Sequence, residues 1–423
     1  MLNKLKYALP VAIAAGFVAM PTLANKLGGH YKNKTITITI PYGPGGTYDK
    51  YGSSFSNHLG KEIAGKPTVI MQYMPGAGGS RAMNWFANVA PKGGYNLLVP
   101  LDNSIVNQLL RPDKMKYNAN DFTWLGSSNQ TNSVIAIRTD SGIKSISDMK
   151  KIKTIASVTG PASSTFLFIS LAGGLLDWKT QIVAGYKGSS RAMFAIEQGE
   201  TQMTAPNWLA WSSKVPHWFT GKRPFAKAIL QNGIDPDPDL PGVPMLTDLI
   251  KEKDKPMAEF LASAGPLGRG LVLPPGAPKR LVAPLRAAYD RMNKSPKFLS
   301  ELKKRKLRLI ATSGADIQKM VAETIKSASP AVVKAARKII FRKREIYQYL
   351  EKAVIGPPFF LLKLTVSTQV FSVSLAIKRS TRRRTSSAPA SAPTSILAIF
   401  SFQRSCCPSM IVMSSLKART EAS

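Results

Sequence analysis

The side chains that most often carry out catalysis are sparse in this sequence. Its 423 residues include three histidines, His30, His58 and His217, and no two of them have the spacing of metal ligands. The two cysteines, Cys406 and Cys407, are adjacent to each other in the carboxyl-terminal tail. The motifs G-x-S-x-G, H-E-x-x-H and G-x-x-x-x-G-K-[ST] do not occur. We therefore expect neither an enzyme nor a protein with a metal or an organic cofactor.

Glycine-rich loops that lead into helices are better suited to binding. Three loops have this form, and their candidate site residues are Gly45, Gly46 and Thr47, then Gly76, Ala77, Gly78 and Gly79, then Gly160, Ser163, Ser164 and Thr165. A helix start offers unpaired N–H groups and the positive end of the helix dipole, and glycine lets an anion approach the backbone. One such loop also occurs for steric reasons alone. Three of them indicate a site for a small anion, such as a carboxylate.

A fourth segment also leads from a predicted strand into a helix. It contains Tyr186, Lys187, Gly188 and Ser189, which add an ammonium group and a hydroxyl group. A capped helix beside an exposed lysine explains this segment equally well. The residues around the first loop are open to two interpretations as well: Tyr42 could form a wall of the site or belong to the core. Asp49 could do no more than satisfy the start of its own helix.

Strands and amphipathic helices alternate along the chain from residue 35, which is typical of an α/β protein with parallel sheets. One predicted helix carries Tyr48, Tyr51, Phe55 and Leu59 on a single stripe. The predicted strands are 36–40, 68–71, 96–99, 134–137, 154–158, 182–185 and 270–273, with one more, 307–311, returning to the first sheet.

The two ends of the chain differ from the body. Lys4 and Lys6 precede an apolar run and a segment of small residues, which predicts a secretory signal over residues 1–24 and a periplasmic protein. An uncleaved anchor is the alternative, although the run is short for a span, which needs about 20 apolar residues. Residues 341–423 are basic and rich in serine, and we expect them to be disordered. A genuine accessory tail is the alternative.

The formal net charge of +34 raises the question of a nucleic acid partner. The basic residues are scattered rather than gathered into one stripe, so we expect no nucleic acid partner. A solvated basic surface explains most of the charge. A positive field that speeds the encounter with an anionic ligand is compatible with it.

Several segments together resemble one protein family. Residues 40–49 (IPYGPGGTYD) resemble the first ligand loop of the tripartite tricarboxylate transporter receptors, the Bug/TctC family of periplasmic solute-binding proteins, and residues 75–79 resemble their second loop. Similarity continues in order through 90–95, 186–188, 240–244 and 270–278. The resemblance implies a type II periplasmic binding fold, in which two α/β lobes close on a ligand around two crossing segments, near 126–133 and 246–268.

The resemblance also implies the domain limits and the site. Lobe 1 would contain residues 25–130 and the returning segment 246–340, and lobe 2 would contain residues 131–245. Tyr42, Gly45, Gly46 and Asp49 would line the cleft from the first lobe, with residues 76–79 beside them. Residues 160–165 and 186–189 would meet the ligand from the second lobe, and Asn207 would reach one of its polar groups.

The sequence departs from the family pattern at several positions. The family often has arginine at the position of Ser53 and Asn-Arg at the positions of Tyr73 and Met74, and an aspartate expected near Gly93 is missing. These changes disfavour highly charged, citrate-like ligands and favour a less polar mono- or dicarboxylate. Met71, Tyr73 and Met74 could equally be packing residues.

The resemblance implies a monomeric receptor that delivers a small carboxylate to a membrane permease. A sensor that presents its ligand to a membrane signalling partner is the main alternative. An exported enzyme acting on a carboxylate is disfavoured, because the sequence lacks a set of catalytic residues.

Overall fold

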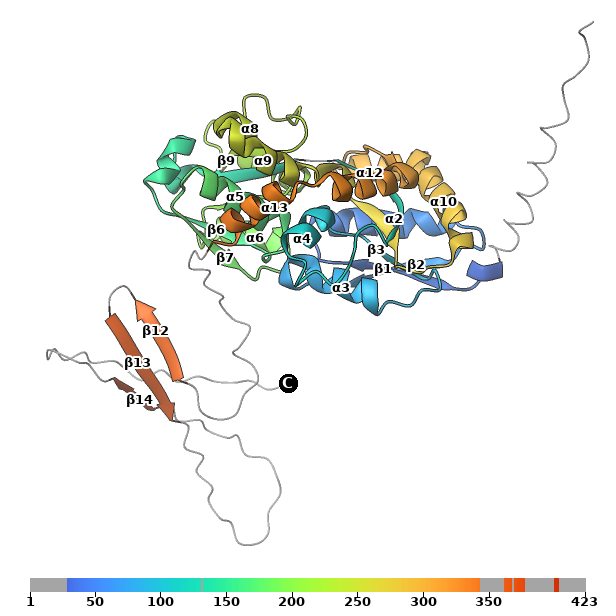
Figure 1. The fold of residues 1–423 in the computed structure, drawn as a ribbon, viewed down its shortest axis with the longest axis horizontal. Coiled ribbons are helices and arrows are strands. Elements are labelled where there is room, and N and C mark those ends of the chain that lie inside the picture. Colours follow the sequence, from blue (N-terminus) through green and yellow to red (C-terminus); the bar gives the residue numbers. More distant parts are fainter. Residues whose placement is uncertain (1–28, 131, 343–360, 367–368, 377–398, 403–423) are drawn as a thin grey trace, which may run out of the picture. The chain divides into compact units, whose positions relative to one another are not determined.

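The computed structural model describes residues 29–130 and 132–342, and the backbone of three further segments, 361–366, 369–376 and 399–402. The expected signal, residues 1–24, lies outside the described residues. The chain divides into two compact units, Met1–Tyr349 and Leu350–Ser423. The first unit contains two sheets, each covered by helices, and these are the two lobes (Figure 1).

The first lobe is built on a six-stranded sheet with the order β11-β4-β10-β3-β1-β2. Strand β1 pairs in parallel with β2 and β3, whereas β10 is antiparallel to β3 and β4. The strands are β1 (Thr35–Ile40), β2 (Thr68–Tyr73), β3 (Asn96–Leu98), β4 (Thr123–Ser127), β10 (Gly270–Leu273) and β11 (Thr312–Ser313).

The second lobe is built on a five-stranded sheet with the order β7-β6-β8-β5-β9. Strand β6 is parallel to β7 and β8, and β5 is antiparallel to β8 and β9. The strands are β5 (Ser133–Arg138), β6 (Thr154–Val158), β7 (Thr180–Ala184), β8 (Met203–Thr204) and β9 (Ala226–Asn232). Of these, β9, like β4 in the first sheet, was not expected from the sequence.

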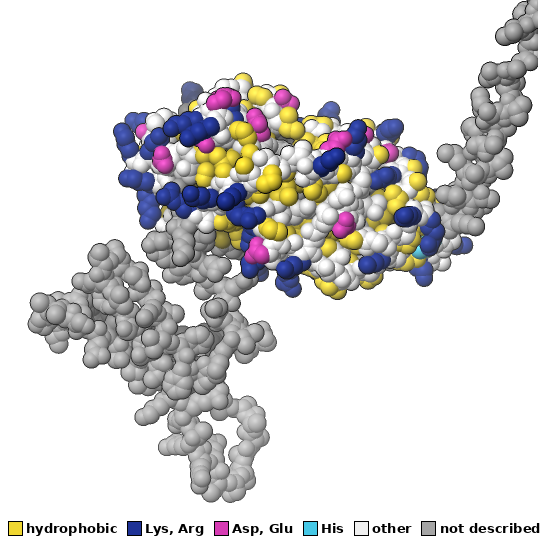
Figure 2. All heavy atoms as spheres, viewed as in Figure 1, with side chains coloured by type: hydrophobic (Ala, Val, Ile, Leu, Met, Phe, Trp, Pro, Cys, Tyr) yellow, Lys and Arg dark blue, Asp and Glu magenta, His cyan; other side chains and the backbone are white. Residues whose placement is uncertain are grey.

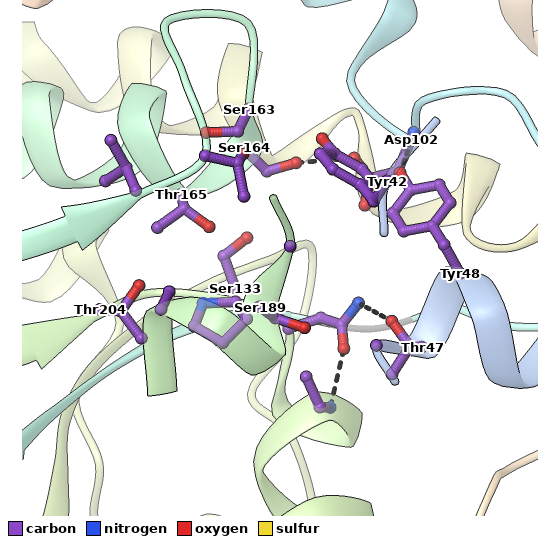
Figure 3. A pocket seen from close by; sticks show the side chains of 18 of the residues that line it. Tyr42, Thr47, Tyr48, Asp102, Ser133, Ser163, Ser164, Thr165, Ser189 and Thr204 are labelled. Carbon is purple, nitrogen blue, oxygen red and sulfur yellow. Dashed lines mark hydrogen bonds between the residues drawn. The ribbon is translucent and has the colours of Figure 1, made fainter. Parts of the chain in front are cut away.

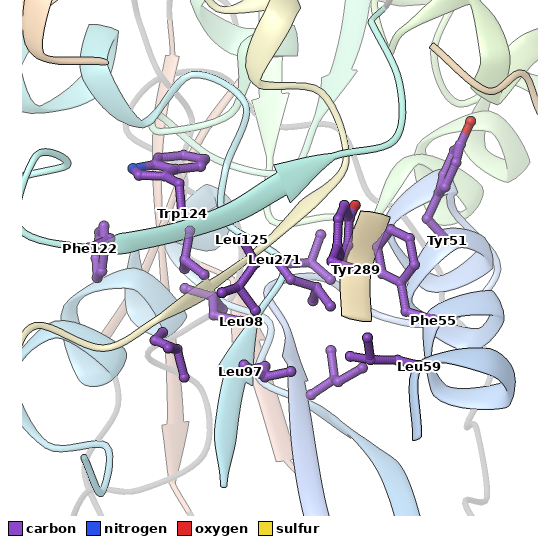
Figure 4. Close-up of a cluster of buried hydrophobic side chains, with 14 of the residues drawn as sticks. Tyr51, Phe55, Leu59, Leu97, Leu98, Phe122, Trp124, Leu125, Leu271 and Tyr289 are labelled. Carbon is purple, nitrogen blue, oxygen red and sulfur yellow. The ribbon is translucent and has the colours of Figure 1, made fainter. Parts of the chain in front are cut away.

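Apolar side chains from the helices and the sheet form the core of the first lobe (Figure 4). The stripe predicted on α2 is confirmed, since Tyr51, Phe55 and Leu59 are fully buried and Tyr48 is 7% exposed. Phe55 packs against Tyr289 of α10, with ring centroids 5.6 Å apart. The helices of this lobe are α2 (Thr47–Glu62), α3 (Ser80–Asn88), α4 (Ser104–Leu110), α10 (Val282–Lys294), α11 (Pro296–Lys304) and α12 (Gly314–Ser327).

The second lobe has its own core, centred on α5, whose residues from Phe166 to Gly173 are all buried. A helix that is apolar on all sides must be covered on all sides. The sheet covers one side of α5, and α9 and α13 cover others. The helices of this lobe are α5 (Ser164–Leu175), α6 (Ser189–Glu197), α7 (Trp208–Lys214), α8 (Leu246–Leu249), α9 (Lys255–Ala262) and α13 (Pro330–Ile340).

The domain limits expected from the sequence need a correction. Residues 246–340 were assigned to the first lobe, but α8, α9 and α13 pack in the core of the second. Val333, Ala336 and Ile340 form the buried stripe of α13. The chain therefore crosses between the lobes a third time, at Ala328 and Ser329, between α12 and α13. An amphipathic stripe predicts that a helix is covered, but not by which lobe.

The strand expected at residues 307–311 is also misplaced. The pairing occurs at Thr312 and Ser313, which form the short strand β11 beside β4. Residues 307–311 are not a strand, although Ile310 N–H donates to the carbonyl oxygen of Ser128 at 3.0 Å, just beyond the end of β4. The alternation of Leu307, Leu309 and Ala311 resembles a strand because short apolar alternations also occur in extended loops.

The first two crossing segments lie against each other between the lobes. Ser128 N–H donates to the carbonyl oxygen of Arg269 at 2.9 Å, and Ser128 Oγ lies 2.6 Å from the hydroxyl oxygen of Tyr289. Gly268 has φ +41°, and a β-carbon there would lie 1.5 Å from the carbonyl oxygen of Asn129. Only glycine lets the two segments approach this closely.

The second unit contains an antiparallel sheet of β12 (Leu361–Val366), β13 (Gln369–Ala376) and β14 (Ile399–Phe402). These strands fall within the range for which the sequence predicted disorder. The structure thus has strands in three segments where the sequence predicts disorder, and the rest of 343–423 lies outside the described residues. Strand-length apolar runs can pair with one another even in a basic, serine-rich segment.

Basic side chains are distributed widely over the first unit. On the face shown in Figure 2, Lys and Arg side chains lie around much of the outline and are separated by apolar areas. This face has no single basic stripe of the kind that tracks a nucleic acid backbone. Among the described residues, no helix is both long enough and apolar enough to cross a membrane.

Candidate ligand cavity between the lobes

A narrow cavity lies where the two lobes meet (Figure 3). Its volume is about 60 Å³. Its lining from the first lobe and the crossing segments consists of Tyr42, Gly43, Gly46, Thr47, Tyr48, Asp102, Ser133 and Arg269. Its lining from the second lobe consists of Val158, Thr159, Ser163, Ser164, Thr165, Gly188, Ser189, Ala192, Thr204, Pro206, Asn207 and Ala210.

Helix starts from both lobes face this cavity. Gly46 precedes α2, Ser163 precedes α5, Gly188 precedes α6 and Asn207 precedes α7, and all four line the space. Each start presents N–H groups and the positive end of a helix dipole. Only α2 has an acidic residue in its first turn, so the positive ends of the other three are not offset by a side chain of their own.

The cap residues are themselves held in place. Ser163 Oγ accepts the N–H of Phe166 at 3.2 Å, and Asn207 Oδ1 accepts the N–H of Ala210 at 2.9 Å. Asn207 Nδ2 also donates to Thr47 Oγ1 of the first lobe at 3.3 Å. The hydroxyls of Thr165 and Ser189 are not used in capping, and Figure 3 shows both side chains beside the central space.

Among the described residues that line the cavity, the full charges are those of a buried ion pair, which was not predicted from the sequence. Arg269 Nη1 donates to Asp102 Oδ2 at 2.8 Å, and the two side chains are 3% and 14% exposed. Asp102 Oδ1 accepts the hydroxyl of Ser164, in the second lobe, at 2.7 Å. Arg269 also donates to Thr47 Oγ1 from Nε and Nη2, at 3.3 and 3.1 Å. The pair therefore joins one crossing segment to both lobes.

Two tyrosines form a wall of the cavity next to this ion pair. The Tyr42 and Tyr48 ring centroids are 4.8 Å apart, and the Arg269 guanidinium lies 3.6 Å from the Tyr48 ring centroid. Burial raises the pKa of both tyrosines, so both phenols are neutral. The Tyr42 hydroxyl donates to Gly78 O at 2.9 Å, and the Tyr48 hydroxyl accepts the N–H of Asp102 at 3.0 Å. Burial by itself lowers the pKa of Arg269, but Tyr48 and Asp102 outweigh it, and the guanidinium stays charged.

Asp49, a candidate from the sequence, lies outside the lining. Its carboxylate accepts the N–H of Gly45 at 2.8 Å and the hydroxyl of Tyr73 at 2.5 Å. It therefore shapes the first loop from behind. Met71 and Met74 pack against the first core. None of the residues at 71, 73 and 74 reaches the cavity, so the inference about ligand polarity that was drawn from them has no support in the geometry.

The second glycine loop, Gly76, Ala77, Gly78 and Gly79, does not line the cavity either. It touches the third loop directly, because a β-carbon on Gly78 would lie 2.7 Å from Ser163 N and one on Gly160 would lie 2.5 Å from Gly78 N. Gly78 O also accepts the hydroxyl of Tyr42 at 2.9 Å. This loop and Gly160 therefore form a backbone contact between the closed lobes.

The fourth segment is divided in the same way. Gly188 and Ser189 line the cavity, whereas Tyr186 and Lys187 do not. The carbonyl oxygen of Lys187 accepts the N–H of Gly43 at 2.6 Å, and its side chain is exposed. Tyr186 donates to Glu200 at 3.4 Å. The main chain of this segment thus contributes a second contact between the lobes.

The sequence analysis missed several lining residues that stand next to strands. Asp102 follows β3 within a few residues, Arg269 precedes β10, Thr204 ends β8 and Ser133 begins β5. A charged residue beside a buried strand was the available signal for the first two. Within the described part of the chain, no three His, Cys, Asp or Glu side chains are grouped to hold a metal ion.

Comparison with known proteins identifies the family of this chain. A family model described as "Tripartite tricarboxylate transporter family receptor" matches residues 54–336. The chain belongs to this receptor family. One relative, named for the tcbD-tcbE intergenic region of a Pseudomonas species, is 24% identical over 300 residues, which cover 69% of this chain and 83% of the relative.

Solved structures of the same kind share the fold. The periplasmic binding protein BugD superposes with a TM-score of 0.58 at 17% identity, covering 73% of this chain and 98% of BugD. An R. palustris protein solved with adipate has a TM-score of 0.57 at 18% identity, covering 72% and 98%. MatC from Rhodopseudomonas palustris, solved with malate, has a TM-score of 0.55 at 20% identity, covering 71% and 99%. The two-lobed periplasmic binding protein fold expected from the sequence is thereby confirmed.

Proposed function

We propose that this protein is a periplasmic receptor that captures a small carboxylate between its lobes and delivers it to a membrane permease of the tripartite tricarboxylate type. The observation that carries the proposal is the convergence of the starts of α2, α5 and α6 on one cavity between the lobes. Helix starts bind anions through backbone N–H groups and the dipole, without a dedicated cation.

The charge in the cavity favours an acid with few carboxylates. Arg269 is already neutralised by Asp102, so the ligand's charge must be met by helix starts and hydroxyls. Each helix start carries about half an elementary charge, so one or two carboxylates are balanced and a third is not. The narrow volume agrees with a compact acid. The adipate and malate in two structural relatives each have two carboxylates.

The residues proposed to contact the ligand are those predicted from the sequence that face the cavity, together with the ion pair. They are Tyr42, Gly46, Thr47, Ser163, Ser164, Thr165, Gly188, Ser189 and Asn207, with Arg269 and Asp102. Arg269 and Asp102 would set the cavity's shape and polarity, and the hydroxyls of Thr165 and Ser189 would donate to a carboxylate. Periplasmic location and delivery to a permease are supported by the family and by the signal-like amino terminus.

A thermal-shift screen of the full chain against mono-, di- and tricarboxylates and aromatic acids tests the ligand class. A ligand at 100 times its dissociation constant stabilises the folded protein by about 2.7 kcal/mol. Calorimetry on the best acid then compares Thr165→Val, which removes a hydroxyl facing the cavity, with Thr220→Val, an exposed threonine. A hydrogen bond to a charged group contributes about 1.5–3 kcal/mol, so we expect Thr165→Val to weaken binding about ten-fold or more.

Two results would contradict the proposal. One is the absence of any shift with every acid, measured on folded protein free of ligand. The other is a Thr165→Val variant that binds the acid as tightly as the Thr220→Val variant does. Delivery is tested separately, by measuring solute uptake in cells that contain the permease and lack this receptor. If uptake is the same with and without added receptor, the protein binds the solute but has no role in its transport.

A further inference from the structure

We propose that a second anion-binding site, specific for a small inorganic oxyanion such as phosphate, lies at the junction of the lobes, outside the ligand cavity. It is formed by Lys50 of the first lobe and by Lys214, Ser190 and Arg191 of the second. We call these four residues the junction cluster. None of them lines the cavity. The first glycine loop separates the two sites, because Gly46 lines the cavity while Gly45 faces the cluster.

Two lysines cross between the lobes in the junction cluster. Lys50 Nζ, on α2, donates to the carbonyl oxygen of Ser213 in the second lobe at 2.9 Å. Lys214 Nζ, on α7, donates to the carbonyl oxygen of Gly45 in the first lobe at 3.5 Å. Each ammonium group thus donates one hydrogen bond to a neutral carbonyl of the opposite lobe, and no carboxylate of the described residues forms an ion pair with either. Each ammonium has further donors to give.

The charges around these lysines are mostly positive. Lys50 and Arg191 disfavour the charged form of Lys214 and so lower its pKa, and Arg305 and Lys306 do the same to Lys50. Arg305 is paired with Glu301 at 2.9 Å. Among the described residues, the carboxylate that acts on both lysines is Asp49, which already accepts Gly45 N–H and the Tyr73 hydroxyl. Closing the lobes therefore brings together like charges that no side chain in the cluster neutralises.

The titration of the two lysines is consistent with this crowding. Burial, Lys50 and Arg191 together lower the pKa of Lys214 to about 8, and burial with the neighbouring cations also lowers the pKa of Lys50. A bound anion would raise the pKa of both lysines again, because it favours their charged form.

A hydroxyl without a partner lies beside Lys214. Ser190 Oγ is buried and has no hydrogen-bond partner among the described residues. A β-carbon placed on Gly45 would lie 2.8 Å from Ser190 Oγ and 3.6 Å from Lys214 Nζ, so the hydroxyl and the ammonium border the same point. A buried hydroxyl left without a partner is costly. A tetrahedral oxyanion has enough acceptor oxygens to bind the hydroxyl and the neighbouring cations together.

Because the junction cluster takes residues from both lobes, it is complete only when they are closed. An anion bound there would favour the closed form and would strengthen carboxylate binding, and by linkage the carboxylate would strengthen anion binding equally. This coupling rests on the proposed carboxylate function, whereas the junction site itself does not.

Calorimetry on the full chain tests the site with inorganic phosphate at constant ionic strength. We compare Lys214→Met with Lys179→Met, which changes an exposed lysine of the same lobe. We expect the wild type and Lys179→Met to bind phosphate, and Lys214→Met to bind it at least ten-fold more weakly. With the acid found in the ligand screen, saturating phosphate should lower the carboxylate dissociation constant about five-fold or more, which is the usual range of coupling between sites.

Three results would overturn the inference: no phosphate binding by the wild type, equal phosphate binding by the wild type and Lys214→Met, or a carboxylate dissociation constant that phosphate raises. The last result would mean that phosphate competes inside the ligand cavity. If no carboxylate binds at all, the proposed function fails, but phosphate binding by the wild type and the two variants still decides whether the junction site exists.

Discussion

Replacing Arg269 by methionine is the perturbation whose consequence follows most directly from the geometry. Methionine keeps much of the side-chain volume against the Tyr48 ring but removes the charge that Asp102 faces at 2.8 Å. The Asp102 side chain is 14% exposed, so water cannot fully replace the guanidinium. The carboxylate retains two partners, the hydroxyl of Ser164 at 2.7 Å and the N–H of Asn103 at 2.8 Å.

The size of the effect can be worked from these contacts. Removing one partner of a buried ion pair costs about 3–5 kcal/mol of unfolding free energy, because it leaves an uncompensated charge. The two retained hydrogen bonds place Arg269→Met near the lower limit, at about 3 kcal/mol. For a unit of roughly 300 residues, the unfolding entropy is about 0.6 kcal/mol per degree, so the melting temperature should fall by about 5 °C. Adding Asp102→Asn removes the unpaired charge and should recover at least half of the loss.

Thermal unfolding followed by circular dichroism measures both variants, with Arg291→Met as the matched control. Arg291 is 55% exposed and lies 3.5 Å from Glu62, and such a surface pair contributes about 1 kcal/mol or less. If Arg269→Met lowers the melting temperature no more than Arg291→Met does, the buried pair is not a strong constraint. If Asp102→Asn recovers nothing in the double variant, the cost does not come from an unpaired carboxylate, and the reasoning fails.

Three further predictions follow from other contacts. Gly160→Ala should weaken ligand binding about ten-fold or more while both lobes stay folded, because its β-carbon would lie 2.5 Å from Gly78 N. The control is Gly142→Ala, where φ is also positive but the nearest atom is 3.8 Å away, and equal affinities of the two variants would contradict the expectation. The pKa of Lys214 is about 8 in the folded protein against 10.5 for an ordinary lysine, so between these pH values the unfolded chain binds more protons. The free energy of unfolding should therefore rise with pH from about 8 to about 10. An equally large rise in Lys214→Met would show that this lysine is not its cause. Phe298→Ala should cost about 3–5 kcal/mol in urea unfolding, since the ring is fully buried; a loss below 1 kcal/mol would show that the site collapses to fill the space.

The local elements can be predicted from residues that are neighbours along the chain. The helix stripe that begins at Tyr48 and the caps at Ser163 and Asn207 depend on residues only a few positions apart. The start of each of these helices can therefore be predicted from the sequence. The ordered loops also determined the family, and with it the two-lobed fold. Of the loops predicted to bind, the parts at Gly46, Ser163–Thr165 and Gly188–Ser189 do face one cavity.

Which residues of those loops face the cavity, and which face the other lobe, depends on contacts between distant parts of the chain. Gly78 and Gly160 are far apart in the sequence and meet because the lobes close on each other, so no local pattern distinguishes this role from ligand binding. Arg269 and Asp102 are 167 positions apart, and their pairing depends on a crossing segment lying beside the end of β3. The apolar stripe of α13 equally predicts burial in either lobe, and the choice depends on which core has an open face for it. Local chemistry determines what each loop can bind, and long-range packing determines what it meets.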